Sequence, residues 1–87
     1  MKFNGVFVVQ KIAGTYYAVP TGKTATEMKC MIKLNDTAAF LFEKAQSGAD
    51  EASLVSAIKE KFGIDEEIAR ADVADFISTL KGAKILE

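Results

Sequence analysis

Carboxylates near the C-terminus are the side chains of this sequence that could most readily do acid–base chemistry. Glu66, Glu67, Asp72 and Asp75 are close enough to share one helix, where two carboxyl groups can act as general acid and base. Bases such as Arg70 interleave with them, which is typical of a solvated helix surface. The chain has no histidine, so it lacks the commonest general base near neutral pH. We therefore expect a protein that is not an enzyme.

Cofactor and metal sites are equally hard to build from these residues. Zinc sites of the usual Cys/His type need more ligands than a single cysteine, Cys30, can supply. Gly14, Gly22 and Gly48 form neither a G-x-G-x-x-G run nor a Walker motif, so no nucleotide cofactor is expected. Cys30 cannot form an internal disulfide, and we interpret it as lining a core or a groove.

Length and composition indicate one small globular domain. The chain has 87 residues, of which 49% are hydrophobic and 26% charged, and it contains a single proline. No apolar run approaches the roughly 18 residues that a membrane helix needs, and the first ten residues lack the order of a signal peptide. We expect no membrane partner and a cytoplasmic location.

Charge is distributed unevenly along the chain. Residues 1–34 carry five lysines and one glutamate, a net +4, whereas the remainder has six bases and eleven acids, a net −5. A basic N-terminal part favours an acidic peptide as partner, and acidic helices disfavour nucleic acid, whose backbone is bound by neutralising phosphates. A solvated surface with uneven charge explains the same distribution and stays an open alternative.

The first part of the chain has the pattern of an antiparallel sheet. Val6–Lys11 and Thr15–Pro20 are β-branched or aromatic runs joined by Ala13-Gly14, which predicts a hairpin. Thr21–Thr26 is a polar connection. Glu27–Leu34 then alternates apolar and polar residues, as a half-buried strand does.

After Asn35 the apolar period changes to that of helices. Asn35, then Asp50 or Ser53, and then Asp65 are candidate N-caps, and Gly48, Gly63 and Gly82 are the corresponding stops. Ile85-Leu86 can fold back as an apolar tail. The order predicts an α+β fold of the winged helix-turn-helix kind, with a three-stranded sheet in residues 1–34 and three helices in residues 35–87 of a single domain, 1–87.

The third strand is the most informative element for function. If it lies at the edge of the sheet, its free amides and carbonyls can pair with an extended peptide or with a second copy of the chain. Apolar or flexible side chains would line the site, and lysines would form its rim. In sequence order these residues are Met28, Lys29, Cys30, Met31, Ile32 and Lys33. For Met28, a place in the core is the simpler interpretation.

Residues 31–87 resemble the PqqD family, small proteins also called RiPP recognition elements. The resemblance rests on the junction Leu34-Asn35-Asp36-Thr37-Ala38, on Leu54-Val55 after Gly48, and on a C-terminal set. That set is Asp72-Val73, Phe76-Ile77, Leu80 and Ile85-Leu86. The resemblance covers about two-thirds of the chain, and the N-terminal hairpin agrees with the family more loosely.

The resemblance implies a peptide chaperone. In the family, the leader of a ribosomally made precursor adds as a strand to the third β-strand and lies against the third helix, and a modifying enzyme, often a radical SAM protein, receives it. Carried over, the helix wall would be Arg70, Val73, Ala74 and Ile77, with Val73 alternatively in the core. No residue identifies the pyrroloquinoline quinone pathway. The alternative is a winged-helix interaction or regulatory domain without a leader peptide.

Overall fold

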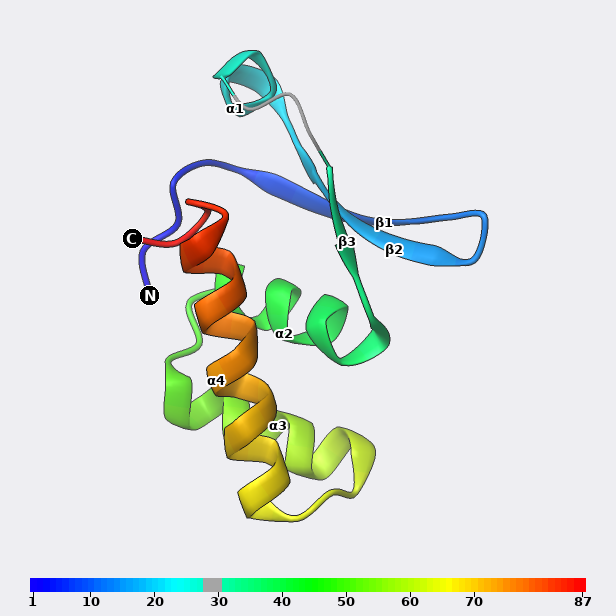
Figure 1. Cartoon of the computed structure of the whole chain (residues 1–87), viewed down its shortest axis with the longest axis vertical. Coiled ribbons are helices and arrows are strands. Elements are labelled where there is room, and N and C mark those ends of the chain that lie inside the picture. The colour runs from blue at the N-terminus through cyan, green and yellow to red at the C-terminus, as the bar shows by residue number, and fades with distance from the viewer. Residues whose placement is uncertain (28–30) are drawn as a thin grey trace.

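The computed structural model describes residues 1–27 and 31–87 of the chain. A three-stranded sheet lies between a short helix above it and three longer helices below it (Figure 1). The elements in chain order are β1 (Phe7–Ile12), β2 (Thr15–Pro20), α1 (Gly22–Glu27), β3 (Ile32–Leu34), α2 (Asp36–Gln46), α3 (Glu51–Phe62) and α4 (Glu66–Gly82). The α+β fold that the sequence predicts is confirmed. Within the described residues, no helix is both long and apolar enough to span a bilayer.

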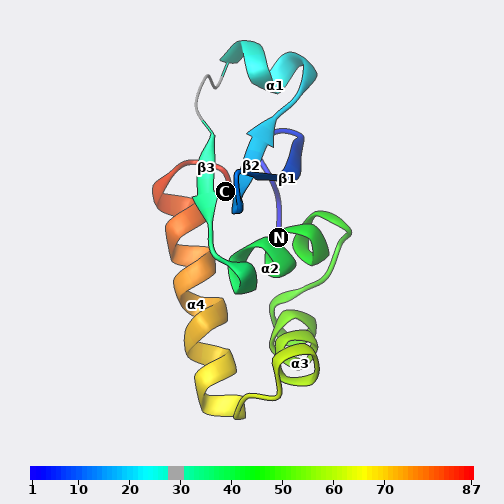
Figure 2. The ribbon, with the colours of Figure 1, turned by 90° about the vertical axis from the view of Figure 1, so that its right-hand side faces the viewer.

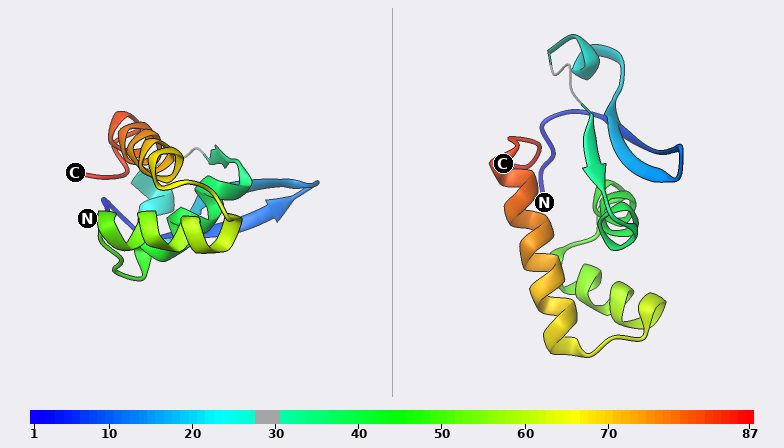
Figure 3. Two further views of the ribbon diagram at one scale, coloured as in Figure 1. Left: turned by 90° about the horizontal axis from the view of Figure 1, so that it is seen from below. Right: turned by 45° about the vertical axis from the view of Figure 1, so that its right-hand side comes forward.

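The hairpin of β1 and β2 turns through Ala13 and Gly14, as predicted. Both residues have positive φ, 50° and 82°, which is the mark of a type I′ turn. Ile12 and Thr15 face each other across this two-residue loop. The tip of the hairpin projects beyond the helices (Figure 3). β2 continues to Pro20 and is the central strand, because β3 pairs antiparallel with its other edge.

The hairpin turn fixes which backbone groups of β3 face the open edge. In a two-residue hairpin, the residues flanking the loop exchange both hydrogen bonds, so Thr15 directs its N–H and C=O toward β1. Backbone direction alternates along a strand, and therefore Tyr16 directs its groups toward β3. Tyr16 pairs with Leu34, and Tyr17 with Lys33. It follows that Lys33 points its N–H and C=O away from β2.

Side-chain caps start two of the helices at the residues that the sequence indicates. The Asn35 side-chain oxygen accepts a 2.7 Å bond from the amide of Ala38, and that of Asp50 accepts a 2.8 Å bond from Ser53. Asp65 precedes α4 as predicted but makes no side-chain cap bond. Because α2 begins directly after β3, the Asn35 cap also fixes how the strand enters the helical layer.

The core lies between the sheet and the helices, with Phe42 of α2 at its centre. The Phe42 ring is fully buried and packs edge-to-face on Phe3, Phe7 and Phe76, at centroid distances of 5.3, 5.7 and 6.3 Å. These contacts join the N-terminal segment, β1, α2 and α4.

Both ends of the chain meet beside the last turn of α4 (Figure 1). Phe3 and Leu86 form an isolated antiparallel bridge, and the amide of Asn4 donates to the Ile85 carbonyl at 2.7 Å. Ile85 and Leu86 are buried, so the predicted fold-back of the apolar tail is confirmed. The N-terminal segment thereby closes over the end of the last helix.

The sequence-based boundaries are wrong in the part between β2 and Asn35. The polar connection predicted at 21–26 contains the short helix α1, which stands apart from the other helices (Figure 2). Amides of its first turn donate hydrogen bonds to the carbonyl of Thr21. None of its residues is buried, so the sequence has no apolar period that would predict this helix. Glu27 belongs to α1, and β3 begins only at Ile32. Part of the predicted strand, residues 28–30, lies outside the described residues. The first strand is shifted by one residue, to Phe7–Ile12.

Candidate functional site

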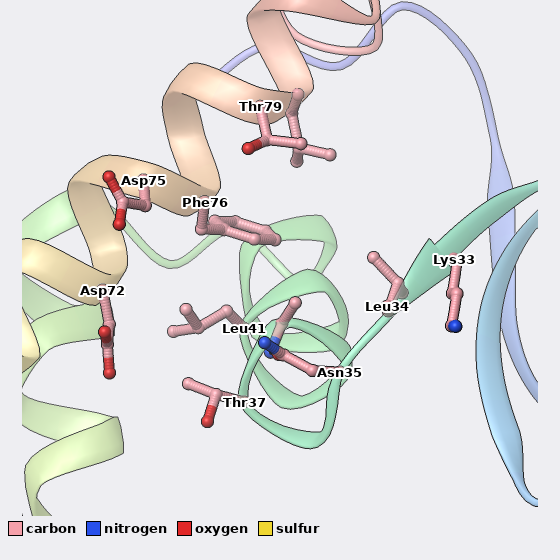
Figure 4. Close-up of a pocket in the computed structure, with 11 residues that line it drawn as sticks. Lys33, Leu34, Asn35, Thr37, Leu41, Asp72, Asp75, Phe76 and Thr79 are labelled. Carbon is pink, nitrogen blue, oxygen red and sulfur yellow. The ribbon is translucent and has the colours of Figure 1, made fainter.

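A groove lies between β3 and α4 in the described part of the chain. Its volume is about 270 Å³, and the first turns of α2 form its floor. In Figure 4, Leu34 points from the strand toward Phe76 and Thr79 of α4, whereas Lys33 points away from them. The lining residues are Lys33, Leu34, Asn35, Thr37, Ala38, Leu41, Asp72, Asp75, Phe76, Thr79 and Leu80.

The groove has an apolar floor and a polar helix rim. Leu34, Leu41 and Phe76 are buried core residues whose surfaces close the bottom of the groove. Asp72 and Asp75 line its α4 side, Asp72 half-buried and Asp75 exposed. Such a surface can take an apolar side chain in its centre and a polar or charged group at its rim.

The strand wall of the groove is an open sheet edge. Within the described residues, β3 pairs only with β2, and the N–H and C=O of Lys33 point away from that partner. An extended chain placed beside β3 can accept a hydrogen bond from the Lys33 N–H and donate one to the Lys33 C=O. It would then continue the sheet as a fourth strand. Its side chains would alternate between the groove and the opposite face of the sheet.

The ion-paired basic residues of α3 and α4 do not neutralise the acidic rim of the groove. Glu66 accepts from Lys59 at 3.1 Å and lies 2.8 Å from Arg70, and these partners, the Lys59 hydrogen bond first, lower the pKa of Glu66. Asp72 and Asp75 form no ion pair with any residue that the structure describes. The rim of the groove therefore presents two carboxylates toward any occupant.

The predicted strand residues reach the site only in part. Met28, Lys29 and Cys30 lie outside the described residues. Met31 precedes β3 and is 52% exposed, and Ile32 is half-buried against the core. Lys33 is among the lining residues of the groove, although its side chain points away from Phe76 and Thr79 of α4 (Figure 4).

The predicted helix wall does not line this groove. Val73 is fully buried and is not among the lining residues of the groove, so its side chain belongs to the core. Arg70, Ala74 and Ile77 follow one another on one flank of the buried stripe of α4, and Asp72, Asp75 and Thr79 follow one another on the other. The groove lies on the flank of the two aspartates.

Sequence reasoning missed the floor and rim of the groove. Thr37, Ala38 and Leu41 come immediately after the strand, and the abrupt change of period at Asn35 was the signal that could have placed them there. Ile68 was also missed. Although apolar, it is 51% exposed, one turn before Asp72 on the same flank of α4. An exposed isoleucine beside a groove is a candidate contact for a long ligand.

The described residues offer little for metal or covalent chemistry. They contain no cluster of three or more histidine, cysteine or carboxylate side chains that could hold a metal ion. The groove residues are threonines, aspartates, Asn35, Lys33 and apolar side chains. The arrangement is suited to holding an extended polypeptide by backbone pairing and side-chain insertion.

Comparison with known proteins points to one family. The family model described as "Coenzyme PQQ synthesis protein D (PqqD)" matches residues 13–86. No curated protein sequence matches the chain. The fold is similar to that of a solved structure, "TbiB1 in Complex with the TbiA(beta) Leader Peptide", with a TM-score of 0.75 and 18% sequence identity. The similarity covers 100% of this chain and 95% of the other.

Proposed function

Because this chain belongs to the PqqD family, we propose that it is a non-catalytic peptide chaperone. It binds the leader of a ribosomally made precursor peptide by strand addition to β3, and it presents the precursor to a modifying enzyme. One observation carries the proposal: the open edge of β3 borders a groove whose other wall is α4. TbiB1, which has a similar fold, was solved with a leader peptide.

The proposed binding residues are those of the strand and of the groove. On the strand side they are Met28 to Lys33, with Lys33 as the backbone contact. On the helix side they are Asp72, Asp75, Phe76 and Thr79. Arg70, Ala74 and Ile77 form a second candidate wall on the opposite flank of α4, which a leader that crosses the helix could reach.

The proposed partner enzyme is a radical SAM protein, as the family resemblance implies. A strand added to β3 keeps one face of the leader in contact with the protein and leaves the chain beyond it free to enter another active site. The matched family is described by its part in coenzyme PQQ synthesis, so a PQQ-type precursor is the first substrate to test.

An amide-shift NMR titration tests the proposal. The probes are synthetic leader segments of the short peptides encoded beside the gene, each compared with a scrambled peptide of equal composition. We expect saturable shifts in residues 31–38 and 72–80 for the authentic leader and none for the scrambled one. Saturable shifts confined to the Arg70, Ala74 and Ile77 flank would move the site to the second wall.

Two other results would change the proposal. A folded monomer that shows no shift with any neighbouring leader would favour the alternative, a winged-helix interaction or regulatory domain. A homodimer joined through β3 would block the same edge, and light scattering with and without peptide detects it because the peptide should then dissociate the dimer.

A further inference from the structure

We propose that the leader carries a specific charge alternation: an acidic residue opposite Lys33, with an apolar and a basic residue at the two adjacent positions. This inference rests on the proposed function and specifies the peptide that the groove accepts. It follows from the direction of the side chains on β3 and from the charges on the two sides of the sheet.

The direction of the β3 side chains determines which leader residue meets which wall. Residues paired across neighbouring strands place their side chains on the same face of the sheet. The side chain of Lys33 points away from the α4 wall of the groove, and that of Leu34 points toward this wall (Figure 4). The leader residue opposite Lys33 therefore lies on the outer face, and its two neighbours face the groove.

Among the described strand residues, the outer face offers a leader residue one cation, Lys33. The other outward-facing residues of the described strands are uncharged; they are Val8, Gln10, Ile12, Thr15, Tyr17 and Val19. Lys33 is exposed and forms no ion pair within the described residues. Opposite charges in a directly facing cross-strand pair are favourable, and a second cation there is unfavourable. An aspartate or glutamate thus fits this position of the leader.

The groove accepts an apolar side chain on its floor. Its volume of about 270 Å³ exceeds the roughly 150 Å³ of an engineered cavity that binds benzene. Buried surfaces of Leu34, Leu41 and Phe76 close the floor. One leader residue next to the acid can fill this space with a leucine- or phenylalanine-sized side chain.

The helix rim of the groove calls for a cation at the other adjacent position. An apolar side chain in the groove removes water from Asp72, which is already half-buried and has no ion-pair partner among the described residues. Desolvating a carboxylate without a partner is costly, and a cation beside it offsets that cost. Lysine or arginine can reach Asp72 and Asp75 from the leader because their long stems pack along the apolar floor.

A selection from a displayed library of random decapeptides tests the alternation. The wild-type protein should enrich peptides with an acid flanked by an apolar and a basic residue. Lys33→Glu should reverse the sign at the central position only. The double variant Asp72→Lys, Asp75→Lys should reverse the sign at the flanking position only. Thermal unfolding of each variant establishes that it is folded before selection.

One enriched peptide then allows a measurement of affinity. Asp72→Asn should weaken its binding about two- to five-fold, as expected for loss of a partly exposed ion pair, and the peptide's Lys→Gln version should not lose this increment again. Glu67→Gln is the matched control, because it removes the same charge from the opposite flank of α4 and should leave affinity unchanged. Enriched peptides whose charge pattern is absent, or is the same for all variants, would overturn the alternation and leave strand addition standing. No enrichment by any folded variant would overturn both.

Discussion

Phe42 is the residue through which the two parts of the molecule are packed together. Its ring packs against Phe3 and Phe7 and also against Phe76, which lines the groove. A change at Phe42 therefore affects the sheet and the groove at once, although the residue itself cannot contact a peptide.

Replacing Phe42 by alanine should be severely destabilising. The loss of a fully buried ring is expected to cost about 3–5 kcal/mol, a large share of the roughly 5–15 kcal/mol of stability that is typical of a domain. Urea unfolding followed by circular dichroism measures it. Phe62→Ala is the control, because Phe62 is 38% exposed and should cost clearly less. Equal losses for the two variants would contradict the central role of Phe42.

Asp50 gives one helix a dependence on pH. The backbone N–H of Ser53 donates to its carboxylate and, as the first cause, holds the pKa of Asp50 below the usual 3.8. A carboxyl group with a lowered pKa in the folded state stabilises the fold above its unfolded pKa, and this contribution is lost as the pH falls through the folded value.

The Asp50→Asn variant isolates this effect, since asparagine also accepts a hydrogen bond at an N-cap but does not titrate. As the pH falls below about 4, we expect the free energy of unfolding of the wild type to decrease relative to that of Asp50→Asn. Urea titrations of both proteins across this range provide the comparison. A difference that stays constant with pH would mean that ionisation of the Asp50 carboxyl group contributes nothing to stability.

At the scale of elements, successive residues of β3 direct their backbone N–H and C=O groups alternately toward β2 and toward the open edge, where the leader is proposed to bind. Proline at Lys33 removes an amide that points to the open edge, so it should preserve the fold and weaken binding of the leader. Proline at Ile32 removes an amide that points to Ala18 of β2, so it should destabilise the sheet itself. Thermal unfolding combined with peptide titration separates the two outcomes. A larger loss of stability for Lys33→Pro than for Ile32→Pro would show that the Lys33 amide, and not the Ile32 amide, points to β2.

Elements with strong local signals were predictable from the sequence. The Ala13-Gly14 turn, the Asn35 cap and the Asp50 cap are set by backbone conformation and by hydrogen bonds within four residues, so the sequence carries them. The short helix α1 has no buried side chain and thus no apolar period. β3 has three described residues, Ile32–Leu34, and the alternation of the sequence alone could not reveal where it begins.

The α4 side of the site shows what the helical period of a sequence cannot predict. The period of α4 identifies the buried stripe correctly, with Ala69, Val73, Phe76 and Leu80 in the core. It does not say which flank of that stripe faces β3, because this depends on how α4 packs against α2 and the sheet. The family resemblance placed the helix wall on the flank of Arg70, whereas the groove lies on the flank of Asp72.

For the whole molecule, the closure of the chain ends should contribute much of the stability. Ile85 is fully buried, and its carbonyl accepts from Asn4. Ile85→Ala should cost about 2–5 kcal/mol, and Ile85→Val only about 0.5–1.5 kcal/mol. Chemical denaturation of both variants measures these two losses in the free energy of unfolding. A loss for alanine no larger than that for valine would show that the tail packs loosely and that the core is complete without it.

Because the bridge between Phe3 and Leu86 holds the two chain ends together, the groove does not depend on the order in which its elements follow one another along the chain. With its ends side by side, the domain could be circularly permuted by joining Glu87 to Met1 through a short linker and opening the chain at Ser47 and Gly48, in an exposed turn. In the permuted chain α4 would precede β3, yet the two would meet as before. The groove would then be rebuilt from swapped halves, and a host protein could carry the domain as an insertion within one of its own loops.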